Sequence, residues 1–146
     1  MATITECIVV DSRYLGCKYV VYQNNVVVQT TGGFAMYTNR KGDEPGTITI
    51  STNISKNSPV VITMFSQIEP GRSRMDNDTK EMRIKWFAQC LDEIAKQVPD
   101  MENGIAFSRA IGCGMAGDVW IIYRQLIDDF ATRNPSARVY ICRLFA

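Results

Sequence analysis

The chain has 146 residues, of which 46% are hydrophobic and 21% are charged, and these are ordinary proportions for a folded globular protein. Sixteen Lys and Arg residues against fifteen Asp and Glu residues leave a formal net charge of +1, which excludes a global field that draws the chain toward nucleic acid or an acidic membrane. We expect one domain over residues 1–146, and a local site for any anion that it binds.

Histidine is absent, which excludes Ser-His-Asp and Cys-His catalysis and leaves carboxylates, cysteines or water for any chemistry. The five cysteines are odd in number and show no CxxC spacing, which argues against a disulfide framework or a zinc site. No apolar stretch approaches the ~18–20 residues that span a bilayer, and no basic region precedes the short apolar run at the N-terminus. We expect a cytoplasmic protein from a reducing compartment, without a metal or a cofactor.

The first half is rich in β-branched and aromatic residues, which predicts short strands at 6–11, 18–22, 25–30 and 47–51. The polar residues Gln23, Asn24 and Asn25 separate the second strand from the third, so that a hairpin turn is expected there. The glycine-bracketed segment 32–46 is the most loop-like part of the chain.

The second half predicts alternating strands and helices. An almost continuous apolar run at 58–67 is typical of a strand buried on both faces. Helix 78–98 is predicted from Asp78 and Glu81 as a capping pair, from Pro99 as its end, and from the apolar spacing of Ile84, Phe87, Leu91, Ile94 and Val98.

A strand at 104–112, a helix at 118–133 and a closing strand at 137–145 follow. The second helix has Asp118 in position to cap it and one apolar face, formed by Val119, Ile122, Tyr123, Leu126, Ile127 and Phe130. Together these elements are a βαβ unit, whose two strands are parallel and joined by a right-handed crossover. The expected fold class is α/β, with a mixed sheet flanked by helices.

The stretch "AIGCGMAGDVW" at 110–120 joins the first strand of this unit to its helix. Such a loop lies at the edge of the sheet where open α/β sheets bind ligands, and Gly112, Gly114 and Gly117 allow a ligand to approach the main chain closely. The helix start and the loop together form an anion nest. A charge-assisted bond contributes ~1.5–3 kcal/mol, whereas micromolar binding needs ~8 kcal/mol, so a second loop has to contribute, and Gly32 and Gly33 are the candidates.

A tight turn without a ligand would also explain these glycines. The spacing G-x-G-x-x-G by itself is a weak signal, and a Rossmann dinucleotide site is disfavoured because this unit is the last in the chain. Asp118 is either a helix cap or a general base. Cys113 is either a small packing residue or a nucleophile. Trp86 and Trp120 are expected in the core rather than as ligand platforms.

The segment "GIAFSRAIGCGMAGDVWIIYRQLIDDFATRNPSARVYI" resembles the C-terminal part of macrodomains, in particular the branch of ADP-ribose 1″-phosphatase-like and terminal ADP-ribose glycohydrolase-like proteins. "PVVITMFSQIEPGR" is similar to the preceding strand of that family, so that the resemblance covers about residues 58–144. It implies a three-layer mixed sheet between helices that binds ADP-ribose at its carboxyl edge. The N-terminal half diverges from the family, and such a compact, divergent chain suits a phage or virus protein.

Carried over to this chain, the resemblance assigns the diphosphate and the distal ribose to the backbone of Gly112, Cys113, Gly114, Met115, Ala116 and Gly117. Ser66 and Gln67 match the end of the strand beside the site, and Asp11 matches the carboxylate that receives the adenine amino group. Asp118 stands where the family often has an acidic residue, and it would act as the general base if the protein hydrolyses an ADP-ribosyl ester or ADP-ribose 1″-phosphate. A degenerate macrodomain that serves as a protein-interaction or assembly module, without nucleotide turnover, is the alternative.

Overall fold

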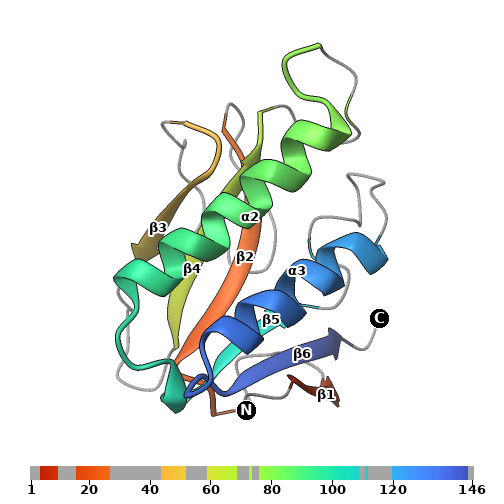
Figure 1. Ribbon diagram of the computed structural model, residues 1–146. Helices are drawn as coiled ribbons and strands as arrows, with labels where there is room; N and C mark the ends of the chain where they lie inside the picture. The colour runs from red at the N-terminus through yellow and green to blue at the C-terminus, as the bar shows by residue number, and fades with distance from the viewer. Residues whose placement is uncertain are drawn as a thin grey trace.

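The computed structural model describes residues 4–9, 16–26, 44–51, 59–68, 73, 76–108, 111 and 120–144. These residues form a six-stranded sheet with the strand order β1-β6-β5-β2-β4-β3 (Figure 1). The strands are β1 (Ile4–Val9), β2 (Tyr19–Asn25), β3 (Thr47–Ser51), β4 (Val60–Gln67), β5 (Ile105–Ser108) and β6 (Val139–Leu144). All neighbouring pairs are parallel except β3 with β4, so the sheet is mixed, as the sequence predicts.

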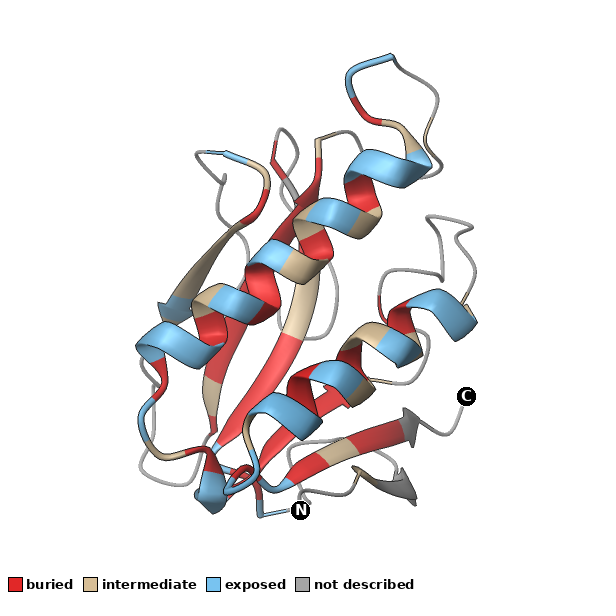
Figure 2. Ribbon diagram, in the orientation of Figure 1, coloured by how far each residue is buried: buried red, intermediate tan, exposed pale blue. Residues whose placement is uncertain are grey.

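The helices α2 (Lys80–Gln97) and α3 (Trp120–Arg133) lie side by side on one face of the sheet (Figure 1). Their inward sides are buried and their outward sides are exposed (Figure 2). The large core between helices and sheet includes Phe87 and Ile94 of α2, Ile127 and Phe130 of α3, and Ile62 of β4. In the part of the chain that the structure describes, no helix is long and apolar enough to cross a membrane.

Strand β4 is buried from Val61 to Gln67, which confirms the prediction of a strand covered on both faces. It pairs with β2 on one side and β3 on the other, so its backbone groups are satisfied within the sheet. Its apolar side chains then add to the core on both faces. This central strand ends with the two polar residues Ser66 and Gln67.

The hairpin expected at Gln23, Asn24 and Asn25 is wrong. These residues are the last three of β2 and continue its parallel pairing with β4, with a register shift between Asn24 and Asn25. Val26 extends the contact, since its N–H donates to the carbonyl of Gln67 over 3.0 Å. Three consecutive polar residues imitate a turn in the sequence, but strand pairing with β4 decides the structure. The rest of the predicted strand 25–30, beyond Val26, lies outside the described residues.

The N-cap of helix α2 lies one residue later than predicted. Thr79 is the N-cap, and its hydroxyl oxygen accepts a hydrogen bond from the N–H of Met82 over 3.1 Å. Asp78 instead forms a two-pronged ion pair with Arg83, with Nε to Oδ1 at 2.8 Å and Nη2 to Oδ2 at 2.7 Å. The helix ends at Gln97, two residues before Pro99, close to the expected boundary.

The C-terminal βαβ unit forms as expected, because β5 and β6 are adjacent and parallel and α3 connects them. The buried side of α3 consists of Tyr123, Ile127, Phe130 and Ala131. Ile122 is predicted on the apolar face but is 40% exposed. It precedes the buried Tyr123 by one residue and therefore lies at the side of the buried face, turned away from the sheet. Trp120 is only partly buried against the core, and Val119 and the predicted cap Asp118 lie outside the described residues.

Candidate site at the carboxyl edge of the sheet

The candidate site lies at the edge where the parallel strands end, which we call the carboxyl edge. The last residues of these strands are Val9, Asn25, Gln67, Ser108 and Leu144. The N-terminal ends of α2 and α3 lie at the same end of the sheet (Figure 1). Both helix dipoles therefore present their positive ends at this edge, which favours an anion there.

A crevice is expected between β2 and β5, which are adjacent in the sheet. From β5 the chain continues to β6 on one side, whereas from β2 it continues to β3 and β4 on the other side. Strands whose connections leave in opposite directions mark the position where open α/β sheets hold their ligands. The sequence segments that follow these two strands contain the two glycine groups singled out above.

Four polar residues lie where β2 and β4 end. Asn24, Ser66 and Gln67 are buried, and Gln23 is partly buried. The side-chain amide of Gln23 donates a hydrogen bond to Oε1 of Gln67 and joins the two strands. The hydroxyl of Ser66 and Oε1 of Gln23 are buried without a hydrogen-bond partner among the described residues. Unpartnered buried oxygens are costly and uncommon, so this cluster is suited to a polar ligand.

Shortly after β5, the N–H of Ile111 donates to the carbonyl of Ser108, the last residue of the strand, over 3.1 Å. Ile111 is buried within the main core, which fixes the start of the connection to α3. At the other end of that connection, Trp120 begins α3 and packs partly on the same core. Ile111 and Trp120, which flank residues 112–119 in the sequence, therefore both contact the hydrophobic core.

The structure brings two of the predicted site residues together, Ser66 and Gln67, at the end of β4. The others lie outside the described residues: Asp11, Gly32, Gly33, Gly112, Cys113, Gly114, Met115, Ala116, Gly117 and Asp118. The sequence pattern does not single out Gln23 and Asn24 as site residues, because three consecutive polar residues indicate a turn. Their position directly after the apolar run 18–22 was the signal that could have identified a strand end at the site.

The described cysteines are unsuited to act as nucleophiles. Cys17, Cys90 and Cys142 are free and buried. Burial raises the pKa of the Cys90 thiol to about 12, and its Sγ donates to the carbonyl oxygen of Thr47 over 3.4 Å. The described residues contain no group of acidic side chains and cysteines arranged to hold a metal ion.

A second cluster of titratable side chains lies at the opposite edge of the sheet, where the parallel strands begin. Asp100 accepts hydrogen bonds from Lys18 at 2.5 Å, from the hydroxyl of Tyr19, and from Asn103 at 3.1 Å. The bond from Lys18, and then that from Tyr19, lowers the pKa of Asp100 to about 2. Desolvation raises the pKa of Tyr19, and the bond to Asp100 raises the pKa of Lys18. The cluster ties the start of β2 to the segment between α2 and β5.

Comparison with solved structures gives matches over nearly the whole chain. The macrodomain of Mycobacterium tuberculosis DarG matches with a TM-score of 0.72 and 15% identity, over 97% of this chain and 98% of that one. An Oceanobacillus iheyensis macrodomain mutant with ADPR matches with a TM-score of 0.66 and 16% identity, over 94% and 83%. Thermosipho africanus DarTG in complex with ADP-ribose matches with a TM-score of 0.68 and 15% identity, over 95% of this chain and 41% of that chain.

No family model and no curated protein sequence matches the chain. The structural matches nevertheless agree on one architecture, and the chain has the macrodomain fold. The predicted α/β class, a macrodomain-like mixed sheet with helices, is therefore confirmed.

Proposed function

We propose that this protein binds ADP-ribose, or a derivative of it, at the carboxyl edge of the sheet. The observation that carries the proposal is the polar cluster of Gln23, Asn24, Ser66 and Gln67, which lies next to the position where the connections of β2 and β5 diverge. The macrodomains of similar fold that are described with ADP-ribose or ADPR support the same ligand class.

In this proposal the diphosphate lies on the backbone N–H groups of residues 112–117, where glycines allow close approach and the start of α3 adds its dipole. Gly32 and Gly33 form the second loop, and Asp11 receives the adenine amino group. Ser66 supplies a hydroxyl at the end of β4, and Gln23 holds Gln67 in place beside it. This division gives the ligand several contacts, which micromolar affinity of about 8 kcal/mol requires.

Hydrolysis of an ADP-ribosyl ester or of ADP-ribose 1″-phosphate is the finer proposal, with Asp118 as the general base. Its carboxylate would take a proton from a water molecule. In an ADP-ribosyl ester the resulting hydroxide would attack the anomeric carbon and break its bond to the ester oxygen, releasing the carboxylate. In ADP-ribose 1″-phosphate it would attack the phosphorus and break the bond to the ribose oxygen, releasing ADP-ribose and phosphate. The substitution Asp118→Ala is expected to abolish product formation in a phosphate-release or ester-cleavage assay, while ADP-ribose still binds. Unchanged turnover by this variant would remove Asp118 from the mechanism.

Isothermal titration calorimetry with ADP-ribose tests the binding proposal. We expect a dissociation constant in the micromolar range for the unmodified chain, and a loss of at least about tenfold for Gly114→Val, because a branched side chain would stand between backbone and phosphate. Ser136→Val is the matched control, since Ser136 is exposed in the turn before β6, at the opposite edge. No heat at millimolar ADP-ribose would refute the proposal. Normal binding by a folded Gly114→Val protein would show that the diphosphate does not bind at residues 112–117.

A further inference from the structure

A groove runs between α2 and α3 on the outer face of the helix layer, away from the sheet. Its volume is about 470 Å³, and its lining is formed by Ala88, Asp92, Leu126, Asp129, Thr132 and Arg133. These residues belong to the middle and C-terminal parts of the two helices, whereas the carboxyl edge lies at their N-terminal ends. The groove is therefore separate from the proposed ADP-ribose site.

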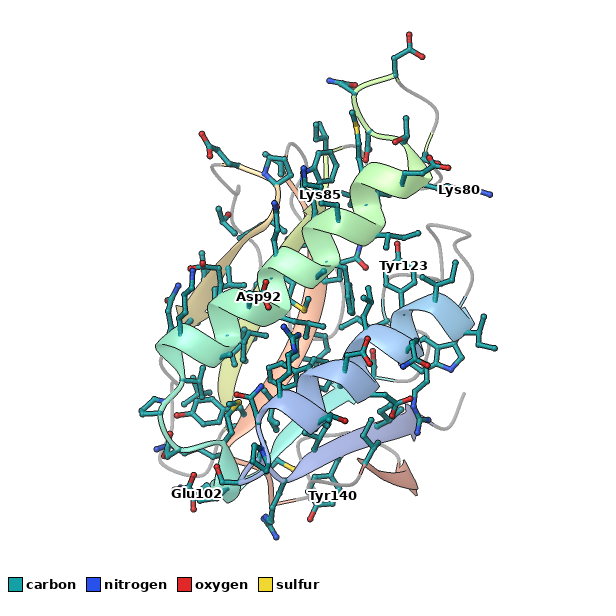
Figure 3. The ribbon with its side chains drawn as sticks, in the orientation of Figure 1. Lys80, Lys85, Asp92, Glu102, Tyr123 and Tyr140 are labelled. Carbon is teal, nitrogen blue, oxygen red and sulfur yellow. The ribbon has the colours of Figure 1, made fainter. Side chains whose placement is uncertain are left out.

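The floor of the groove is apolar. Ala88 and Leu126 are half-buried, and the rings of Phe87 and Tyr123 pack edge to face behind them with centroids 4.7 Å apart. Figure 3 shows Tyr123 between the two helices. Ile122, one turn before Leu126, continues the apolar surface and is 40% exposed. Such a surface is suited to one or two aliphatic side chains of a partner.

The rim of the groove carries an excess of negative charge. Arg133 bridges the helices by donating to Asp92 over 3.0 Å, and Arg124 pairs with Asp128 at 3.4 Å. The carboxylate of Asp129 accepts a hydrogen bond from the side-chain amide of Gln125 at 3.0 Å and pairs with no Lys or Arg among the described residues. Nε of Arg133 donates to the backbone carbonyl of Asp129 at 3.3 Å, not to its carboxylate. Asp129 also lies in the last turns of α3, where the helix dipole disfavours a carboxylate. A cation supplied from outside would relieve both effects.

We propose that this groove binds a segment of another protein that carries aliphatic side chains followed by Lys or Arg. The aliphatic side chains rest on Ala88 and Leu126, and the cation pairs with Asp129. The acidic rim disfavours nucleic acid and acidic peptides. The contact is independent of the nucleotide, so that the protein holds both ligands at once.

The test uses a fluorescein-labelled helical peptide with two leucines one turn apart followed by two lysines, and a matched peptide with glutamates in place of the lysines. Fluorescence anisotropy is expected to show at least about tenfold tighter binding of the basic peptide. Amide chemical shifts in a ¹⁵N-labelled protein should change along α2 and α3 and not at the start of β2. Equal binding of both peptides, no binding of the basic one, or shifts confined to another surface would overturn the proposal.

Matched variants assign the binding to this groove. Asp129→Lys should weaken binding of the basic peptide by at least about tenfold. Glu102→Lys makes the same charge change at an exposed position after α2 (Figure 3) and should leave this binding unchanged. Ala88→Phe fills the groove and should abolish binding, whereas Ala95→Phe, exposed two turns further along α2, should retain it. Urea unfolding confirms that each variant is folded. Self-association in sedimentation that Ala88→Phe abolishes would identify a second copy as the occupant and contradict the proposal.

Discussion

Two hydroxyl groups on β4, those of Thr63 and Ser66, are buried without a hydrogen-bond partner among the described residues. Each is expected to destabilise the folded chain, because a buried, unpaired polar group costs about 1–3 kcal/mol. Their positions differ, since Thr63 lies in the middle of the strand and Ser66 near its carboxyl end. A cost of this kind is expected where a residue contacts a ligand, and Ser66 is the one at the proposed site.

Replacement of Ser66 by Ala should separate binding from stability. Without the hydroxyl, the free energy of unfolding is expected to stay the same or rise by up to about 1 kcal/mol, while affinity for ADP-ribose falls about tenfold. Urea unfolding and calorimetry measure the two effects. Thr63→Val is the control, since it removes a similar hydroxyl away from the edge and should leave affinity unchanged. Full affinity in Ser66→Ala would exclude this hydroxyl as a ligand contact.

The ion pair between Asp78 and Arg83 is almost completely buried, with side chains 0% and 1% exposed. Asp78 precedes the N-cap of α2 and Arg83 lies four residues after it, so the pair occupies the positions of a hydrophobic staple. Arg83→Met alone removes the paired cation from a buried carboxylate and should lower the free energy of unfolding by about 3–5 kcal/mol.

The combined variant Asp78→Leu with Arg83→Met should recover most of that loss, because two apolar side chains can form the staple themselves. Arg133→Ala, which breaks the exposed pair with Asp92, should cost less than about 1 kcal/mol. Urea denaturation measures all three variants. A loss in Arg83→Met no larger than in Arg133→Ala would contradict the burial argument.

At the scale of elements, the cluster of Lys18, Tyr19 and Asp100 joins the start of β2 to the end of the α2 connection. Because the pKa of Asp100 is about 2 in the folded chain and ordinarily 3.8, its contribution is complete above about pH 4 and is lost as the pH falls toward 2. The raised pKa values of Lys18 and Tyr19 act oppositely, so their contributions are complete below pH 10 and are lost as the pH rises further.

Asp100→Asn should therefore flatten the acid limb of the stability profile. Urea unfolding midpoints measured between about pH 2 and pH 7 should fall toward low pH in the unmodified chain and fall less in the variant. Glu102→Gln provides the control, since Glu102 is an exposed carboxylate two residues further on. An equal effect of both variants would show that the acid limb arises elsewhere.

The elements whose residues follow one simple pattern were predicted closely from the sequence. Strand β3 has the predicted bounds, and α2 differs from its prediction by two residues at its start and one at its end. The errors concern side chains whose roles depend on distant partners. Asp78 pairs with Arg83 instead of capping the helix, and Gln23 extends β2 because β4 lies beside it. The polar end of β2 could not be recognised without that parallel pairing, which is a long-range contact.

At the scale of the whole molecule, the macrodomain fold places two surfaces at different ends of the same helix pair. The carboxyl edge, with the polar ends of β2 and β4, is the proposed nucleotide site, and the acidic groove lies on the outer face between α2 and α3. Because the net charge of the chain is close to zero, each surface is expected to attract its ligand through nearby charges and not through the charge of the whole protein.

A crystal structure of the protein with ADP-ribose tests the central claim most directly. The account predicts the ligand at the carboxyl edge between β2 and β5, with its diphosphate within hydrogen-bond distance of backbone N–H groups in residues 112–117 and a ribose near Ser66. An edge filled by the protein's own side chains, with those N–H groups bonded internally and the ligand absent or elsewhere, would contradict it.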